Sequence, residues 1–151
     1  MPHAVYRVTV AHPAEAVFAF VSDAENNPRW HAHVNETRWV DPPPIRVGRR
    51  ARQTGHLFGR DWAFLAEVVE LDAPRRVVYR VIEGPRVQTA IDVEPIDEHT
   101  SGLTLAVTTP PRLPGPIDRF LGRLLRRSTE ARGRGDLARL DAALEAAAKA
   151  P

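Results

Sequence analysis

Histidine offers the widest range of chemistry in this sequence, and two histidines stand close together. His31 and His33 form a His-x-His pair, while His56 and His99 lie elsewhere in the chain. A zinc site needs three or four converging ligands, but residues at this spacing face opposite ways on a strand and diverge on a helix, so we predict no metal site. A single histidine could act as a general base on an acidic ligand proton, although the spacing offers no oriented triad.

Arg52 and Tyr79 are the two candidates for a catalytic role, and Arg80 is next to Tyr79. A guanidinium group inside a cavity must be paired, and it could hold a carboxylate or stabilise an enolate. The alternative is that both arginines lie on a convex, solvated face. Tyr79 shares a strand face with Val77 and Val81, and an inward hydroxyl group there needs a partner, which a ligand carbonyl, a water molecule or a neighbouring side chain can supply.

Other arrangements of catalytic residues are missing from the sequence. It contains no cysteine, which excludes a thiolate nucleophile and a Cys-ligated zinc. It has no glycine-rich phosphate loop, no nucleophile elbow and no paired-carboxylate motif. Asp92 and Glu94 fall on the polar face of a predicted strand, where acidic side chains favour solubility.

The length and composition fit one globular domain over residues 1–151. Of the 151 residues, 43% are hydrophobic and 26% are charged, which allows a core large enough to enclose a modest cavity. No stretch approaches the roughly 18 apolar residues of a membrane span, so we expect no membrane insertion. The N-terminus lacks the basic start and apolar run of a signal peptide. These features favour a cytoplasmic protein.

The charges are nearly balanced, with 21 basic against 19 acidic residues and a net charge of +2. One local excess of arginine lies between residues 119 and 134. Nucleic-acid binding would need base-reading or stacking groups beside such a patch, and the aromatic residue nearby, Phe120, sits in an apolar row. We therefore predict a solvated helix face and no nucleic-acid partner. The arginines are Arg119, Arg123, Arg126, Arg127, Arg132 and Arg134.

Alternating apolar and polar residues predict a sheet of about seven strands. One apolar and one polar face for each strand is typical of an antiparallel sheet. Helical spacing between Pro13 and Val21, followed by a short turn or helix with Trp30, predicts one or two short helices after the first strand. The predicted strands are Val5–Val10, Val34–Val40, Arg49–Leu57, Asp61–Leu71, Arg76–Ile82, Val87–Glu94 and Gly102–Thr108.

A long helical pattern follows the last predicted strand. Its apolar stripe continues through Leu137, Leu140 and Leu144, while Gly133 and Gly135 favour a bend or break, and residues from about 145 to 151 should fray. The order of elements predicts an α+β fold in which a curved antiparallel sheet wraps around one long amphipathic helix. Such a sheet leaves a wedge beside the helix, which only bulky side chains or a ligand can fill.

Three segments of the sequence, at residues 10–23, 67–80 and 101–105, carry a resemblance to a known family. They resemble the START-like, Bet v 1-like superfamily, and in particular its polyketide cyclase/dehydrase and lipid-transport group, SRPBCC. The opening of that group is similar to VAHPAEAVFAFVSD at residues 10–23 with the following Pro28-Arg29-Trp30. Its central hairpin is similar to EVVELDAPRRVVYR at residues 67–80, preceded by Val47-Gly48. The start of one of its strands is similar to SGLTL at residues 101–105.

The resemblance implies a helix-grip fold with a deep apolar cavity between the sheet and the C-terminal helix. Members bind lipids, sterols, polyketides or hormones, some catalyse cyclisation or dehydration, and most act without a metal or nucleotide, so we expect no cofactor. Trp30 corresponds to a position at the cavity mouth, where it is either a ligand contact or a core plug. The expected ligand-binding residues are Trp30, Trp62, Phe64, Tyr79, Ile91, Leu105, Phe120 and Leu124.

The sequence thus favours a protein that binds a small hydrophobic or amphipathic molecule. The alternative is a polyketide cyclase, aromatase or dehydratase that uses the same cavity, with Arg52, Tyr79 or a histidine managing protons. A more distant alternative is a protein-interaction module that uses the arginine-rich helix. The oligomeric state stays open, with a homodimer as one option. Polar groups converging in the cavity would favour the enzyme, and a purely apolar wall would favour the carrier.

Overall fold

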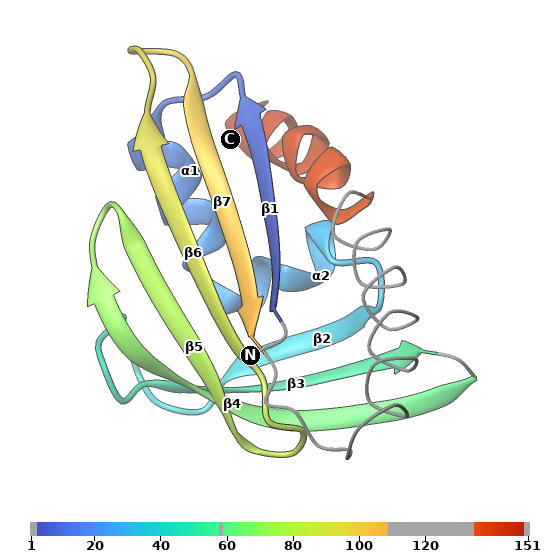
Figure 1. The fold of residues 1–151 in the computed structure, drawn as a ribbon. Helices are drawn as coiled ribbons and strands as arrows, with labels where there is room; N and C mark the ends of the chain where they lie inside the picture. Colours follow the sequence, from blue (N-terminus) through green and yellow to red (C-terminus); the bar gives the residue numbers. More distant parts are fainter. Residues whose placement is uncertain (1–2, 58, 109–134, 150–151) are drawn as a thin grey trace.

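The computed structural model describes residues 3–57, 59–108 and 135–149. It contains one sheet, short helices after the first strand, and a helix over residues 135–149 (Figure 1). In chain order the elements before that helix are β1 (His3–Val10), α1 (Ala14–Val21), the 3-10 turn η1 (Ala24–Asn26), α2 (Asn27–Trp30), β2 (Val34–Trp39), β3 (Arg50–Leu57), β4 (Arg60–Asp72), β5 (Arg76–Glu83), β6 (Gln88–Pro95) and β7 (Ser101–Thr108).

The seven strands form one antiparallel sheet in the order β1-β7-β6-β5-β4-β3-β2. The sheet curls, so that β2, β3 and the long β4 cross the lower part of the molecule below β1 and β7 (Figure 1). The pairing of β4 with β5 has register shifts at Leu65/Ala66 and at Val68/Glu70, and bulges of this kind bend a strand and increase its twist. The curved, seven-stranded antiparallel sheet predicted from the sequence is confirmed.

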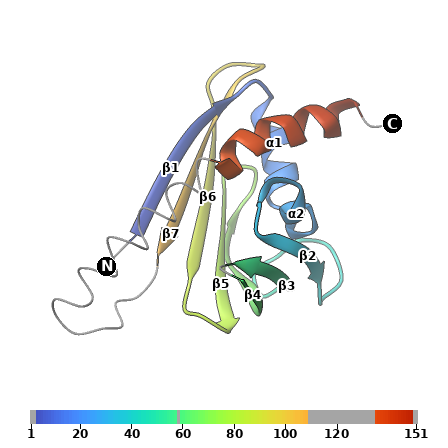
Figure 2. The same cartoon turned by 90° about the vertical axis from the view of Figure 1, so that its right-hand side faces the viewer.

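The helix over residues 135–149 and α1 lie on the same side of the sheet (Figure 2). Leu137, Leu140 and Leu144, the predicted apolar stripe, are no more than 4% exposed. They join Val17 of α1 and Val77 of β5 in one hydrophobic core. The predicted helix-grip arrangement is therefore present, and the described part of this helix runs to residue 149.

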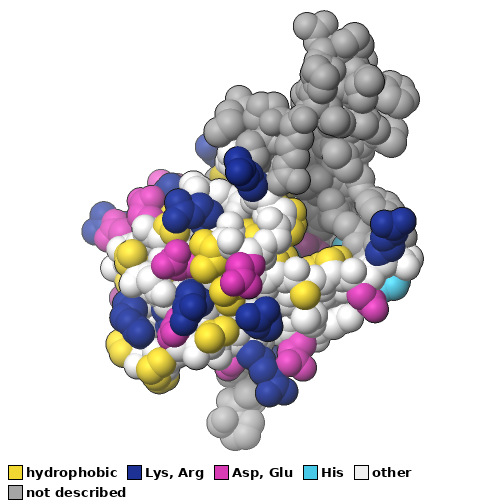
Figure 3. Space-filling view, turned by 90° about the horizontal axis from the view of Figure 1, so that it is seen from below, with side chains coloured by type: hydrophobic (Ala, Val, Ile, Leu, Met, Phe, Trp, Pro, Cys, Tyr) yellow, Lys and Arg dark blue, Asp and Glu magenta, His cyan; other side chains and the backbone are white. Residues whose placement is uncertain are grey.

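The outer surface carries charges of both signs. Seen from below, basic and acidic side chains are interspersed and apolar ones are scattered (Figure 3). Asp92 of β6 pairs with Arg76 of β5, with Nη1 of Arg76 2.7 Å from Oδ2 of Asp92. Within the described ranges, no helix is long and apolar enough to cross a bilayer. Phe120, Leu124 and the arginine cluster between residues 119 and 134 lie outside the described residues.

Candidate functional site

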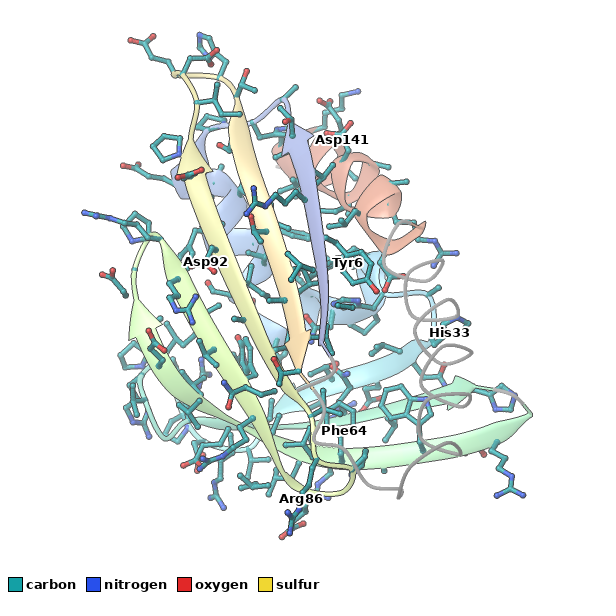
Figure 4. All side chains as sticks on the ribbon, viewed as in Figure 1. Tyr6, His33, Phe64, Arg86, Asp92 and Asp141 are labelled. Carbon is teal, nitrogen blue, oxygen red and sulfur yellow. The ribbon has the colours of Figure 1, made fainter. Side chains whose placement is uncertain are left out.

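A cavity of about 370 Å³ lies on the concave side of the sheet. Residues from all seven strands, from the segment around α2 and from the helix over residues 135–149 line it. Tyr6, His33 and Phe64 come from β1, from the turn before β2 and from β4, and together they border the cavity (Figure 4). The curl of the sheet thus brings side chains from both ends of the chain to one space.

One part of the cavity surface, which we call the apolar wall, consists of hydrophobic side chains. Trp62 and Phe64 stack on the inner face of β4, with ring centroids 5.1 Å apart and planes inclined by 7°. Gly55 on β3 makes room for this stack, because a Cβ atom there would collide with the Trp62 ring and with the His33 carbonyl oxygen. The apolar wall comprises Ala51, Trp62, Phe64, Ile91 and Leu105.

Gln53 on β3 is fixed by two hydrogen bonds inside the cavity. Its Oε1 accepts from Nδ2 of Asn27 and from Oγ1 of Thr37, each at 2.8 Å. All three residues line the cavity. Because both bonds use the amide oxygen, the Nε2 group of Gln53 keeps its two donors, and no residue in the described part of the chain accepts from it.

His31 pairs with an acidic residue of the helix over residues 135–149. Nδ1 of His31 is 2.9 Å from Oδ2 of Asp136, and Oδ1 of Asp136 accepts from the backbone N–H of Ala32 at 3.0 Å. Both side chains line the cavity. Asn27 precedes His31 by one helical turn, and the backbone N–H of His31 donates to the Asn27 carbonyl oxygen. We call Asn27, His31, Thr37, Gln53 and Asp136 the polar end of the cavity.

Tyr79 reaches across from β5 to the end of α1. Its hydroxyl group donates to the backbone carbonyl oxygen of Ser22 at 2.6 Å. Burial raises the pKa of the Tyr79 phenol, the carboxylate of Asp23 raises it further, and the Arg49 guanidinium partly opposes these effects. The hydroxyl group therefore stays protonated at neutral pH, and it donates its proton in the hydrogen bond to Ser22.

The sequence-predicted site residues fall into three groups. The first group lines the cavity and consists of Trp62, Phe64, Tyr79, Ile91 and Leu105.

The second group lies away from the cavity. Trp30 does not line it and is fully buried, and its ring lies against the His31 ring at a centroid distance of 3.7 Å, with the two planes tilted by 33°. Arg52 and Arg80 are exposed and lie on the opposite face of their strands from Gln53 and Tyr79. Both arginines therefore lie on the solvated face of the sheet, which was the alternative to a position inside the cavity. The third group, Phe120 and Leu124, belongs to a segment that is not described.

Sequence reasoning missed Asn27, Gln53 and Asp136. One signal for Asp136 was available, because it precedes Leu140 by four residues and therefore shares the apolar stripe of that helix. An acidic residue on a buried helix face needs a partner, and His31 is that partner. Both His31 and His33 line the cavity, but no group of three or more possible metal ligands occurs among the residues described.

Comparison with protein families gives a match over residues 1–145 to the model for polyketide cyclase / dehydrase and lipid transport proteins. The chain belongs to this family. The family description includes both cyclisation and lipid transport, so it supports a role in ligand binding or polyketide cyclisation without choosing between them. No protein in the curated set matches the sequence.

Several solved structures share the fold of this family member. The Zhui aromatase/cyclase from Streptomyces sp. R1128 superposes with a TM-score of 0.80 at 17% identity, covering 98% of this chain and 96% of that one. A protein from Thermus thermophilus superposes with a TM-score of 0.79 at 21% identity, covering 97% of this chain and 99% of that one. A START superfamily protein from Mycobacterium smegmatis gives 0.64 at 19% identity, covering 90% and 98%. At these identities the likeness concerns the fold alone.

Proposed function

We propose that the protein binds one small amphipathic molecule, lipid-like or polyketide-like, in the cavity between the sheet and the helix over residues 135–149. The observation that carries this proposal is the division of one cavity into an apolar wall and a polar end. A volume of about 370 Å³ lies within the range of roughly 300–1,000 Å³ that is usual for small-molecule sites.

The two parts of the cavity set the orientation of the ligand. The stacked rings of Trp62 and Phe64 take its apolar body, because burying apolar surface is the main favourable contribution to binding. An oxygen of the ligand accepts from the Nε2 group of Gln53, whose orientation Asn27 and Thr37 fix in advance. The ligand class is therefore a mostly apolar molecule that bears at least one carbonyl or carboxyl oxygen.

The experiment that tests binding is a fluorescence titration with 8-anilinonaphthalene-1-sulfonate, followed by displacement with fatty acids and aromatic ketones of increasing size. Phe64→Ala enlarges the cavity beside Trp62, so the relative affinity for larger over smaller competitors should rise by at least about tenfold, which is about 1.4 kcal/mol. Ile82→Ala is the matched control, because Ile82 is exposed on the other face of β5. Unchanged selectivity in Phe64→Ala would contradict ligand binding at this cavity.

A salt series separates this function from that of a protein-interaction module. Contact between an arginine-rich surface and an acidic partner weakens steeply as salt is added, since screening acts on exposed charges. Binding to the apolar wall should change little between low and high salt. A steep loss of probe affinity with salt would contradict the proposed site.

The second candidate function is an enzyme of the cyclase, aromatase or dehydratase type. The observation in its favour is that polar groups do converge in the cavity, from α2, β2, β3 and the helix over residues 135–149. Steady-state turnover of an aromatic or poly-ketone substrate by the purified protein would support the enzyme. Saturable binding with no turnover across such a panel would support the carrier.

A further inference from the structure

The face of the sheet opposite the cavity carries five side chains in register, which we call the charged row. Successive side chains of a strand point to opposite faces. Since Tyr6, Leu105 and Ile91 line the cavity, their neighbours in β1, β7 and β6 point to the outer face. From β1 to β4, with each residue opposite the next, the charged row consists of Arg7, Thr104, Asp92, Arg76 and Asp72.

The charged row has an ion pair near its centre and an unpaired charge at each end. Nη1 of Arg76 lies 2.7 Å from Oδ2 of Asp92. Arg7 and Asp72 are exposed, and neither forms an ion pair with another residue of the described ranges. Four strand spacings of about 4.8 Å separate them, which is roughly 19 Å along the sheet. One molecule therefore presents a free cation at β1 and a free carboxylate at β4.

A hollow of about 770 Å³ lies over the charged row, and all five of its residues line this hollow. Two further features leave space there. Gly102 of β7 has no side chain, and a Cβ atom added to it would have only an Ile96 methyl group nearby, at 3.9 Å. The helix over residues 135–149 and α1 lie on the other side of the sheet (Figure 2). A long side chain from another molecule can therefore enter the hollow.

A strip of apolar side chains, which we call the apolar row, borders the charged row on the same outer face. Its exposed end is Val5, at 48% exposure. Removing apolar surface from water favours association, so a partner that covers the charged row also gains from covering this strip. From β1 to β5, with each residue opposite the next, the apolar row consists of Val5, Ala106, Ala90 and Val78.

We infer that this outer face binds a second copy of the chain in a symmetric dimer. The twofold axis runs parallel to the strands and passes between the β6 strands of the two copies, so β1 of one copy lies over β4 of its partner. Arg7 then meets the partner's Asp72, and Asp72 meets the partner's Arg7. Near the axis each Asp92 is already neutralised by its own Arg76, and Ala90 lies against the partner's Ala90.

Charge complementarity favours a second copy as the occupant. A partner for this face needs an anion over Arg7 and a cation over Asp72, with a neutral or apolar surface across the roughly 19 Å between them. The same face with its strand order reversed has this pattern, and a symmetric interface uses one patch twice. The cavity lies on the opposite side of the sheet, so this inference does not rest on the proposed ligand binding.

Sedimentation velocity of the whole chain at low salt, over a concentration series, tests the dimer. We expect the wild-type protein to pass from monomer to dimer in the micromolar range. Arg7→Glu should raise the Kd by at least about tenfold, because two attractive pairs in each dimer become repulsive. Asp72→Arg should do the same. Arg52→Glu is the matched control, because Arg52 is exposed on the outer face of β3 and lies outside the hollow. Circular dichroism establishes that each variant is folded.

A mixture of the two single variants gives the sharpest result. Each variant alone brings like charges together at both ends of the charged row. A heterodimer of Arg7→Glu with Asp72→Arg regains two attractive pairs, so the equimolar mixture should dimerise with a Kd within about threefold of the wild-type value. No rearrangement inside one molecule can produce this recovery. A mixture that dimerises no better than the separate variants would overturn the inference.

Cross-linking gives a second readout that does not need the charge variants. The chain has no cysteine, so Ala90→Cys introduces a single thiol beside the axis. Facing sheets lie roughly 10 Å apart, a distance that a short bismaleimide spans. We expect Ala90→Cys to form a cross-linked dimer at micromolar concentration and Arg52→Cys to stay monomeric. Failure of Ala90→Cys to cross-link, equal cross-linking of both variants, or a wild-type protein that is monomeric at every concentration would each contradict the proposed interface.

Discussion

The hydroxyl group of Tyr79 donates a 2.6 Å hydrogen bond to the carbonyl oxygen of Ser22. This bond joins β5, at the centre of the sheet, to the residue that ends α1. Ser22 is buried, so its carbonyl oxygen would lose its side-chain donor if Tyr79 were changed. The helix and the sheet are therefore linked at the edge of the cavity by a polar contact as well as by the core.

The first prediction concerns the strength of this link. Tyr79→Phe removes the donor and leaves the ring in place, which should lower the free energy of unfolding by about 1–2 kcal/mol. Urea unfolding monitored by circular dichroism measures the change. Equal midpoints for Tyr79→Phe and the wild-type protein would show that the bond does not form in solution.

The second prediction concerns alkaline pH. The pKa of Tyr79 is raised above its ordinary value of 10.0, mainly by burial. A raised pKa stabilises the fold below the unfolded value, and this contribution is lost as the pH rises through the folded value. A spectrophotometric titration follows the phenolate absorbance, and the difference in absorbance between the wild-type protein and Tyr79→Phe reports Tyr79. This difference should show that Tyr79 ionises well above pH 10, together with unfolding. Ionisation of Tyr79 near pH 10 in the folded protein would disprove its burial.

The third prediction concerns acid. Arg50 donates to both carboxylate oxygens of Asp41, from its side chain and its backbone N–H, and these bonds lower the pKa of Asp41 to about 2. A lowered pKa adds stability above the ordinary value of 3.8, and that stability is lost as the pH falls towards 2. Asp41→Asn should therefore be less stable than the wild-type protein at pH 6, and the difference should vanish near pH 2. Parallel urea curves at both pH values test this, and a constant difference would count against the ion pair.

The fourth prediction concerns the support of the apolar wall. Gly55→Ala places a methyl group into the Trp62 ring and the His33 carbonyl oxygen, so the stack on Phe64 must shift. We expect a loss of about 1–3 kcal/mol in unfolding free energy and a changed tryptophan emission. Gly102→Ala is the control, because the nearest side-chain atom, of Ile96, would be 3.9 Å away. Equal effects of the two substitutions would rule out a specific role for Gly55.

The fold could be predicted from the sequence because the alternation of apolar and polar residues along a strand shows which of its two faces is buried. In β6 and β7 the alternation is regular, and Ile91 and Leu105 fall on the cavity side as their patterns indicate. In β3 the pattern fails, since RARQTGHL carries polar residues on both faces. The sequence therefore could not show that Gln53 faces the cavity while Arg52 faces solvent.

The polar end of the cavity was beyond sequence reasoning for a different physical reason. His31 and Asp136 are 105 residues apart, and their contact depends on how the last helix packs across the sheet. Periodicity along the chain describes local structure and does not identify such tertiary neighbours. The partner of Tyr79 was missed in the same way, because it is a backbone carbonyl group 57 residues away.

The most direct test of the central claim, that the cavity holds a small amphipathic molecule, is native mass spectrometry of the wild-type protein. We predict a 1:1 complex with a compound carried through purification or added from the displacement panel, and a reduced bound fraction in Gly55→Ala but not in Gly102→Ala. A wild-type protein that shows only its own mass, with every compound of the panel present in excess, would contradict the claim.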